Sequence, residues 1–266
     1  MADPLTIWRR FLARKNDDPV KTFGVAVLVA FISAVVVSTT SVTLKPLQDA
    51  HLAAARAARI EAMLDTLPGL RGLMEEAGIT ALETRMVELS SGSFAPEVVY
   101  DDFDSIAAAE DPATGIAIPP DADIAGLKRR ENHAPVYLLE RDGDLMLLVL
   151  PMRAVGYQST ITAMLALQPD LRTIAALTIT GQGETPGLGA RIADPNWASL
   201  WPGKQIANDS GEIVINVVRG QASGPYQIDG ISGATRSSNA VGAMLQFWLG
   251  DLGFGPFLDR LESEGL

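Results

Sequence analysis

The chain has 266 residues, enough for one large domain or two small ones with a buried core. It has no Cys, which excludes disulfides, thiolate metal sites and thiol nucleophiles, and its only His are His51 and His133, so no metal site is expected. A formal charge of −11 argues against a nucleic-acid surface. Any cofactor chemistry would therefore have to be done by a group that the chain holds.

The first predicted element is an apolar helix over residues 22–44. TFGVAVLVAFISAVVVSTTSVTL runs for 23 residues without a charge between Lys21 and Lys45, which is long enough to cross a bilayer core of roughly 30 Å. A cleaved signal peptide is the alternative, but its apolar region is normally only about 7–15 residues long. We therefore predict a single transmembrane helix.

The charges on either side of this helix predict its orientation. Residues 1–21 carry five basic and three acidic residues, whereas residues 45–266 carry 16 basic and 29 acidic ones. Basic residues close to a membrane span remain in the cytoplasm. We therefore expect a cytoplasmic N-terminus over residues 1–21 and, in a bacterium, an inner-membrane protein with a large periplasmic domain.

The chain after the anchor is predicted to begin with a helical stalk over residues 45–67, because LQDAHLAAARAARIEAML is rich in Ala with apolar residues near a helical period. The remainder, residues 68–266, is predicted to be one extramembrane domain. Its first part, residues 68–130, alternates short helical patterns with loops and carries no motif.

Strand patterns begin at Pro135. VYLLE and LMLLVL flank an Asp-Gly turn at residues 142–143, which is a strong hairpin signal. STITAMLAL and TIAALTIT flank QPDLR as a second hairpin, and EIVINVV is a further strand. We therefore predict an α+β domain with a mostly antiparallel sheet and flanking helices.

The last predicted element is a helix whose apolar residues recur three and four positions apart: Val241, Met244, Leu245, Trp248 and Leu249. Thr235, Ser237 or Ser238 is expected to cap its start, and Gly250 its end. The stretch SGAT, residues 232–235, lies in the turn before it. Unpaired amides and the helix dipole make such a position a seat for a phosphate.

SGAT has two interpretations from its residue types. It is either a small-residue turn that caps a helix, or an anion site where Gly233 and Ala234 clear space and Thr235 offers its hydroxyl. A Thr hydroxyl is a weak nucleophile without an adjacent base, so its modification would need another enzyme. A third interpretation, the nucleophile elbow GxSxG with Ser232, is the weakest, because Ala234 replaces the last Gly and His133 precedes the Ser.

A second glycine-rich stretch, GQGETPGLGA, covers residues 181–190. It is neither a Walker loop nor a dinucleotide fingerprint, since no Gly-Lys-Ser/Thr follows and Pro186 occupies the last fingerprint position. It is either a long turn or a loop whose backbone amides approach a planar or anionic ligand.

Together these stretches carry a family resemblance. DGISGAT, residues 229–235, resembles the motif at which a flavin transferase attaches FMN, taken from FAD, to the Thr hydroxyl through a phosphoester bond. GETPGLGARI, the following NWASLWPGKQ and an anchor ending in VTLKPLQ resemble the C subunit of the sodium-translocating NADH:quinone oxidoreductase. The similarity also covers PVYLLE and STITAMLALQPD, and so most of the chain.

The resemblance implies the site residues. FMN would be attached to Thr235, with Asp229 and Gly230 as part of the motif that the transferase recognises. The residues around the flavin would come from both stretches: Ser232, Gly233, Ala234, Glu184, Thr185, Pro186, Gly187, Leu188 and Gly189. No residue would act as a catalytic acid or base, because the flavin carries the electrons.

The chain departs from the family pattern at two places. Arg236-Ser237-Ser238-Asn239-Ala240 stands where the family has Leu-Thr-Ser-Asn-Gly, and RAVGYQS, residues 153–159, stands where the family has GKGLWS. Arg236 would either pair with the flavin phosphate or face water. Tyr157 would supply a ring in place of the missing Trp.

The function that the resemblance implies is an electron-carrier subunit with covalent FMN. Its partners would be the membrane, the flavin transferase and the other subunits of the NADH:quinone oxidoreductase complex. The alternatives are the G subunit of the related Rnf electron-transport complex and a membrane-anchored flavoprotein or structural subunit outside such a pump. NWASLWPGK and the chain length favour the quinone reductase.

Overall fold

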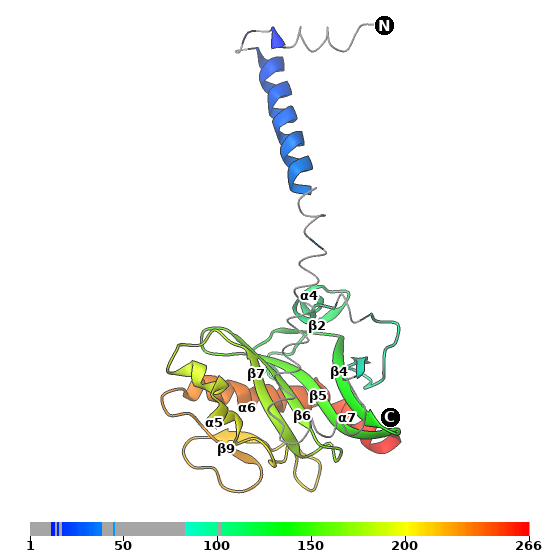
Figure 1. Ribbon diagram of the computed structural model, residues 1–266, viewed down its shortest axis with the longest axis vertical. Helices are drawn as coiled ribbons and strands as arrows, with labels where there is room; N and C mark the ends of the chain where they lie inside the picture. The colour runs from blue at the N-terminus through cyan, green and yellow to red at the C-terminus, as the bar shows by residue number, and fades with distance from the viewer. Residues whose placement is uncertain are drawn as a thin grey trace. The chain divides into compact units, whose positions relative to one another are not determined.

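A computed structural model describes residues 12, 13, 15, 18–38, 45, 83–99 and 103–265 (Figure 1). The chain separates into two compact units, Met1–Ile60 and Glu61–Leu266. The predicted stalk lies outside the described residues apart from Lys45, and so do residues 39–44 of the predicted membrane span.

The first unit contains a helix over Pro19–Ser38 with a mean hydropathy of 2.4 and none of its apolar window buried within the protein. Asp18 caps it by accepting a hydrogen bond from the backbone N–H of Val20 at 2.8 Å. Twenty residues of α-helix measure about 30 Å, the thickness of a bilayer core. In the described part of the chain it is the one helix long and apolar enough to cross a membrane.

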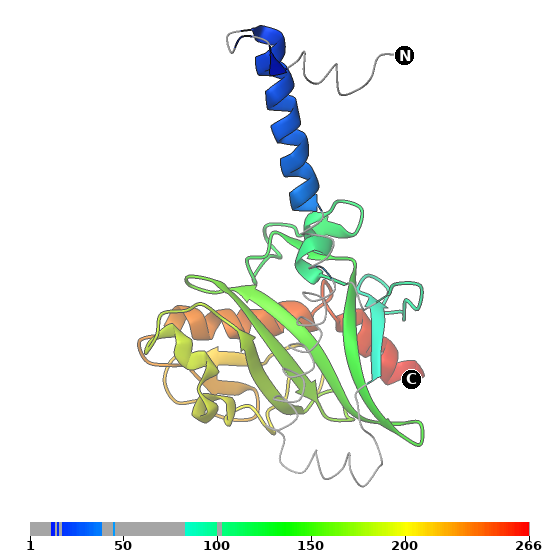
Figure 2. The same ribbon diagram turned by 45° about the horizontal axis from the view of Figure 1, so that its top comes forward.

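The second unit is built on a five-stranded sheet in the order β1-β4-β5-β6-β7, with every neighbouring pair antiparallel. Its strands are β1 (Glu83–Glu88), β4 (His133–Arg141), β5 (Asp144–Val155), β6 (Thr160–Leu167) and β7 (Ile174–Gly181). Helices α6 (Thr235–Leu249) and α7 (Gly255–Glu264) lie on one face of this sheet (Figure 2). The predicted α+β fold with an antiparallel sheet is confirmed.

Both predicted hairpins are present in the sheet. Asp142 and Gly143 join β4 to β5 with φ of 55° and 89°, positive values that a tight two-residue hairpin turn requires. Residues 168–173 join β6 to β7. The predicted strand EIVINVV is shorter than expected: only β8 (Asn216–Val218) forms, and it pairs in parallel with β9 (Gln227–Asp229).

The prediction of short helical patterns and loops for residues 68–130 missed three strands. Between them lie α4 (Ser105–Glu110), β2 (Gly115–Ala117) and β3 (Arg129–Glu131), but also β1, which pairs with β4 at the sheet edge. The segment ETRMVE buries only Met86 and Val87, so it lacks the clear alternation of a half-buried strand. Its pairing with β4, about fifty residues away, depends on tertiary contacts that no local pattern shows.

A buried ion pair connects the small β3 strand to the main sheet. The guanidinium of Arg153 donates to both carboxylate oxygens of Glu131, one at 2.6 Å, and both side chains are buried. The backbone carbonyl of Arg153 accepts a hydrogen bond from Trp248 Nε1 at 2.7 Å. The guanidinium carbon of Arg153 lies 5.3 Å from the centre of the Trp248 ring. This pair therefore ties β3, β5 and α6 together.

Replacing Glu131 with Gln is expected to lower the free energy of unfolding by about 3 kcal/mol, because Arg153 is then left buried without a countercharge. Denaturant unfolding of the detergent-solubilised protein, followed by tryptophan fluorescence, measures the loss. The control is Glu262→Gln, whose partner Arg172 lies at 2.9 Å on the surface, where a pair contributes about 0–1 kcal/mol. Equal effects of the two variants would contradict the prediction.

Candidate functional site

The SGAT turn leads directly into α6. The residue before the helix is Ala234, and no side chain forms a capping hydrogen bond there. Gly233 has a φ of 81°, in the left-handed region that favours glycine. Thr235, the first residue of α6, is half-buried, while Ser232 and Gly233 are exposed. The start of α6 therefore lies at the surface, and no side-chain cap occupies its first backbone N–H groups. Backbone N–H groups at a helix start are the groups that bind anions.

The predicted N-caps of this helix were wrong. Thr235 is already helical, and the two serines that follow are buried and bonded elsewhere. Ser237 Oγ donates to Glu184 Oε2 at 2.6 Å, and Ser238 Oγ donates to the Ala234 carbonyl at 2.9 Å. A hydroxyl inside the first turn points back to such partners instead of capping the free amides. Gly250 does end the helix as predicted.

The ETPGLG loop follows β7 and lies against the SGAT turn. Its Glu184 and Gly189 are buried, whereas Pro186, Gly187 and Leu188 are exposed and Thr185 is half-buried. Leu188 Cδ2 lies 3.6 Å from the point where a Cβ on Gly233 would be. Two segments that are more than forty residues apart in sequence are thus neighbours in the fold.

Glu184 joins this loop to two other segments. Its Oε1 accepts hydrogen bonds from the backbone N–H groups of Gln158 at 3.0 Å and Ser159 at 3.2 Å, and its Oε2 accepts one from Ser237 Oγ. Burial alone would raise the pKa of Glu184, but these hydrogen bonds outweigh it and lower the pKa below its ordinary value. The carboxylate is therefore ionised at neutral pH.

The two departures from the family pattern meet beside Thr235. The guanidinium carbon of Arg236 lies 5.1 Å from the centre of the Tyr157 ring, and both side chains are exposed. A cation over an aromatic ring at this distance is attracted to it. The exposed Leu188 and Tyr157, with 51% and 56% of their surface accessible, place apolar side chains near the SGAT turn.

Asp229 and Gly230 shape the approach to the turn. Asp229 Oδ1 accepts a hydrogen bond from the backbone N–H of Ala222 at 2.5 Å, and its carbonyl accepts one from Trp197 Nε1 at 2.8 Å. The N–H of Gly230 donates to the Val218 carbonyl at 2.8 Å, and a Cβ on Gly230 would lie 2.7 Å from that oxygen. Both residues thus have a structural reason for their identity.

The structure does not assemble the serine hydrolase alternative. His133 lies at the start of β4, in register with Glu88 of the edge strand β1. Across residues 83–99 and 103–265, no hydrogen bond joins a His to Ser232. His51 is outside the described residues.

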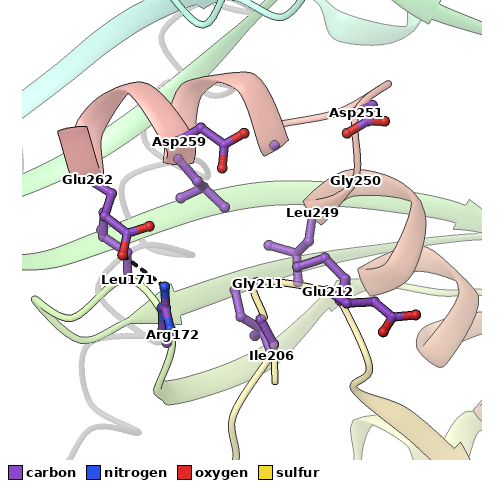
Figure 3. A pocket seen from close by; sticks show the side chains of 14 residues that line it. Leu171, Arg172, Ile206, Gly211, Glu212, Leu249, Gly250, Asp251, Asp259 and Glu262 are labelled. Atoms are coloured by element: carbon purple, nitrogen blue, oxygen red, sulfur yellow. Dashed lines mark hydrogen bonds and ion pairs between the residues drawn. The ribbon is translucent and has the colours of Figure 1, made fainter. Parts of the chain in front are cut away.

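A cavity of about 350 Å³ lies elsewhere, between the end of α6, the helix α7 and residues 206–213 (Figure 3). Apolar residues such as Ile206 and Leu249 and acidic residues such as Asp259 and Glu262 line it. It contains no predicted site residue, and Leu249 is at the opposite end of α6 from Thr235. The candidate site is therefore the surface around Thr235 and not this cavity.

Sequence reasoning did not find the residues that hold Glu184. Gln158, Ser159 and Gly156 belong to the turn between β5 and β6, and Ser237 was taken for a cap. The one sequence signal that could have indicated a close contact in this turn was its small residues, Gly156 and Ser159, in a segment that departs from the family pattern. Nothing local connects that segment to position 184.

The fold and this surface define an FMN-binding domain: the family model of that description matches residues 156–250. The match runs from the β5–β6 turn through the ETPGLG loop and SGAT to the end of α6.

Curated relatives identify the family more closely. The C subunit of the Na(+)-translocating NADH-quinone reductase from Pseudomonas aeruginosa is 37% identical over 93% of this chain and 98% of the relative. The C subunit from Vibrio alginolyticus is 35% identical over 96% of this chain and all of the relative. The chain belongs to this family, the C subunits of the Na(+)-translocating NADH-quinone reductase, as the resemblance predicted.

Solved structures agree. The crystal structure of NqrC from Shewanella oneidensis superposes with a TM-score of 0.68 at 30% identity and covers 77% of this chain and 98% of that one. The C subunit from Parabacteroides distasonis, with a TM-score of 0.53 at 24% identity over 74% of this chain and 88% of that one, shares the fold.

Proposed function

We propose that the chain carries FMN covalently bound to Thr235 and serves as an electron-carrier subunit of a membrane Na(+)-translocating NADH-quinone reductase. The observation that carries the proposal is the position of Thr235, half-buried at the first residue of a helix without a side-chain cap, beside the ETPGLG loop. FMN supplies the ability to accept and donate electrons. The protein residues supply attachment and orientation.

The phosphate end of the cofactor fits the start of α6. A phosphoester on Thr235 would lie at the positive end of the helix dipole, next to the first-turn amides. The side chain of Arg236 is exposed on the next residue and lies over Tyr157. A guanidinium binds phosphate oxygens well, so Arg236 would pair with the phosphate.

The surroundings also suit a planar ring. Leu188 and Tyr157 are exposed apolar side chains near the SGAT turn, and a flavin ring would cover part of that apolar surface. Gly187, with a φ of 76°, and Gly233 leave backbone accessible where a ring would approach. Thr185 and Pro186 belong to the same loop surface.

Attachment requires a partner enzyme. A Thr hydroxyl is a weak nucleophile without an adjacent base, so a flavin transferase would catalyse the step. The Thr235 oxygen forms a bond to the phosphorus of FMN, the pyrophosphate bond of FAD breaks, and AMP leaves with the hydroxyl proton passing to solvent. Asp229 and Gly230, which fix the approach to the turn, would present the motif to that enzyme.

The arrangement in the membrane follows from the charge pattern. Residues 1–21 would be cytoplasmic, residues 22–44 would cross the inner membrane, and residues 45–67 would form a stalk. The FMN-binding domain, residues 68–266, would lie in the periplasm. There it would exchange electrons with the other subunits of the complex.

Intact mass spectrometry of the denatured protein tests the proposal. The chain is expressed for export with a flavin transferase, purified and denatured. The expected result is a mass increase of one FMN residue on the intact chain, which digestion and peptide mapping then assign to the peptide that contains Thr235. An unmodified mass in a correctly exported preparation with active transferase would contradict covalent attachment. Subunits that purify with the chain distinguish the quinone reductase from the alternative Rnf-type complex.

A further inference from the structure

We infer that Glu184 is the positioning residue of the flavin site and that it does not contact the flavin. Its carboxylate holds together the three segments around the attachment point: the β5–β6 turn, the ETPGLG loop and the first turn of α6. The inference rests on the proposed function, because the site that Glu184 orders is the proposed flavin site. It differs from the resemblance, which placed Glu184 among the cofactor-binding residues.

Both carboxylate oxygens are occupied by protein donors. Oε1 receives the backbone N–H groups of Gln158 and Ser159, with Ser159 Oγ at 3.4 Å, while Oε2 receives Ser237 Oγ at 2.6 Å. Ser159 Oγ in turn accepts from the backbone N–H of Gly183 at 2.7 Å. Glu184 is only 4% exposed. This burial, together with the donors at both oxygens, separates the carboxylate from a ligand on the surface.

Two glycines allow the backbone to close around this carboxylate. A Cβ on Gly156 would lie 2.5 Å from Glu184 Oε1. A Cβ on Gly189 would lie 2.5 Å from Ser237 Oγ and 2.9 Å from Glu184 Oε2. Real Cβ contacts are longer than this, so only glycine permits the approach at both positions. The surroundings are shaped to a carboxylate at position 184.

The chemistry requires an ionised carboxylate at this position. An ionised carboxylate only accepts hydrogen bonds and offers about four lone-pair sites, which matches a cluster made entirely of donors. In a Gln at this position, one of the two oxygens is replaced by an NH2 group, and this group would face a protein donor instead of accepting a hydrogen bond from it. Asp is one methylene shorter and would not reach Ser237 and the backbone of residues 158–159 together.

The residues that hydrogen-bond to Glu184 lie close in sequence to the residues of the proposed flavin site. Ser237 follows Thr235 by two positions in the same helical turn, and Ser159 follows Tyr157 by two. Glu184 itself directly precedes the exposed loop that ends in Leu188. One carboxylate thus holds together the backbone segments that carry the attachment residue, the aromatic residue and the loop.

The test compares Glu184→Ala, Glu184→Gln and Ser237→Ala with the control Leu89→Ala in the full chain. Leu89 is fully buried beside the edge strand β1, and its truncation removes about 2–5 kcal/mol of stability without touching the site. Three quantities are measured: the rate of FMN incorporation by the transferase, the midpoint potential of the attached flavin, and amide hydrogen exchange.

The expected result is that Glu184→Ala slows incorporation at least about 10-fold, since misplacing a reacting group costs rate, and shifts the potential. Ser237→Ala gives a smaller change in the same direction, and Leu89→Ala incorporates FMN at the wild-type rate. Hydrogen exchange in Glu184→Ala speeds up together at residues 156–159 and in the first turn of α6. Leu89→Ala leaves both segments protected relative to the rest of its domain.

Two results would overturn the inference. One is wild-type incorporation and potential in Glu184→Ala with faster hydrogen exchange spread over the domain as in Leu89→Ala, which would make the residue merely structural. The other is a potential shift in Glu184→Gln without a change in incorporation or exchange, which would indicate direct flavin contact. Hydrogen exchange needs no flavin, so if the wild-type chain never acquires FMN, the proposed function fails while the exchange comparison still decides the role of Glu184.

Discussion

Replacing Thr235 with Ala is expected to abolish covalent flavin attachment and to reduce NADH-dependent quinone reduction by the assembled complex to background. The phosphoester needs the hydroxyl oxygen, and Ala has none. The change should cost less than about 1 kcal/mol of stability, because Ala has the highest helix propensity and Thr235 is not the helix cap. Intact mass, in-gel flavin fluorescence and quinone reduction by the complex measure the effects on attachment and activity, and denaturant unfolding measures the stability.

Two variants in the same turn act as controls for this prediction. Ser232→Ala removes an exposed hydroxyl three residues earlier and should keep the FMN mass. Thr235→Ser keeps a hydroxyl at the attachment position and should also be modified. FMN retained in Thr235→Ala, or lost in Ser232→Ala alone, would move the attachment away from Thr235.

The elements that the sequence predicted well are those defined by local patterns. The Asp142-Gly143 turn needs two positive φ angles and has two residues that tolerate them. The helix at residues 235–249 follows from one apolar stripe and ends at the expected glycine. Such features are determined by neighbours within a few residues, so a single sequence is enough to find them.

The features that sequence reasoning missed depend on distant contacts. The strand β1 is defined by its pairing with β4, not by its own alternation. Ser237 looked like a helix cap because its partner Glu184 is 53 positions away. A hydroxyl near a helix start has the same local pattern whether it caps the helix or bonds a distant buried carboxylate.

The Arg236–Tyr157 contact shows the same limit in the proposed site. Sequence comparison marked both positions as departures from the family pattern, and each received a separate role. The structure places the guanidinium over the ring, so the two departures form one contact. The contact joins the β5–β6 turn to the residue that directly follows Thr235.

The second large effect is expected at Gly189 and not at Gly187, although both belong to the ETPGLG loop. Gly187 has a φ of 76° and open space where a Cβ would go, so Gly187→Ala costs about 1 kcal/mol of backbone strain. Gly189 does not have a positive φ, but a Cβ added there would lie only 2.5 Å from Ser237 Oγ and collide with it. Gly189→Ala should therefore cost about 2–3 kcal/mol by overpacking and slow FMN incorporation more than Gly187→Ala does.

A double-mutant cycle identifies the cause of the Gly189 effect. Ser237→Ala removes the oxygen with which the new Cβ would collide, so Gly189→Ala combined with Ser237→Ala should cost less than the sum of the two single changes. Unfolding free energies of the four proteins measure the coupling. Additive costs would mean that Gly189→Ala acts through Glu184 or the backbone alone. A clear coupling would show that the last glycine of the loop is required because α6 places its first buried hydroxyl against it.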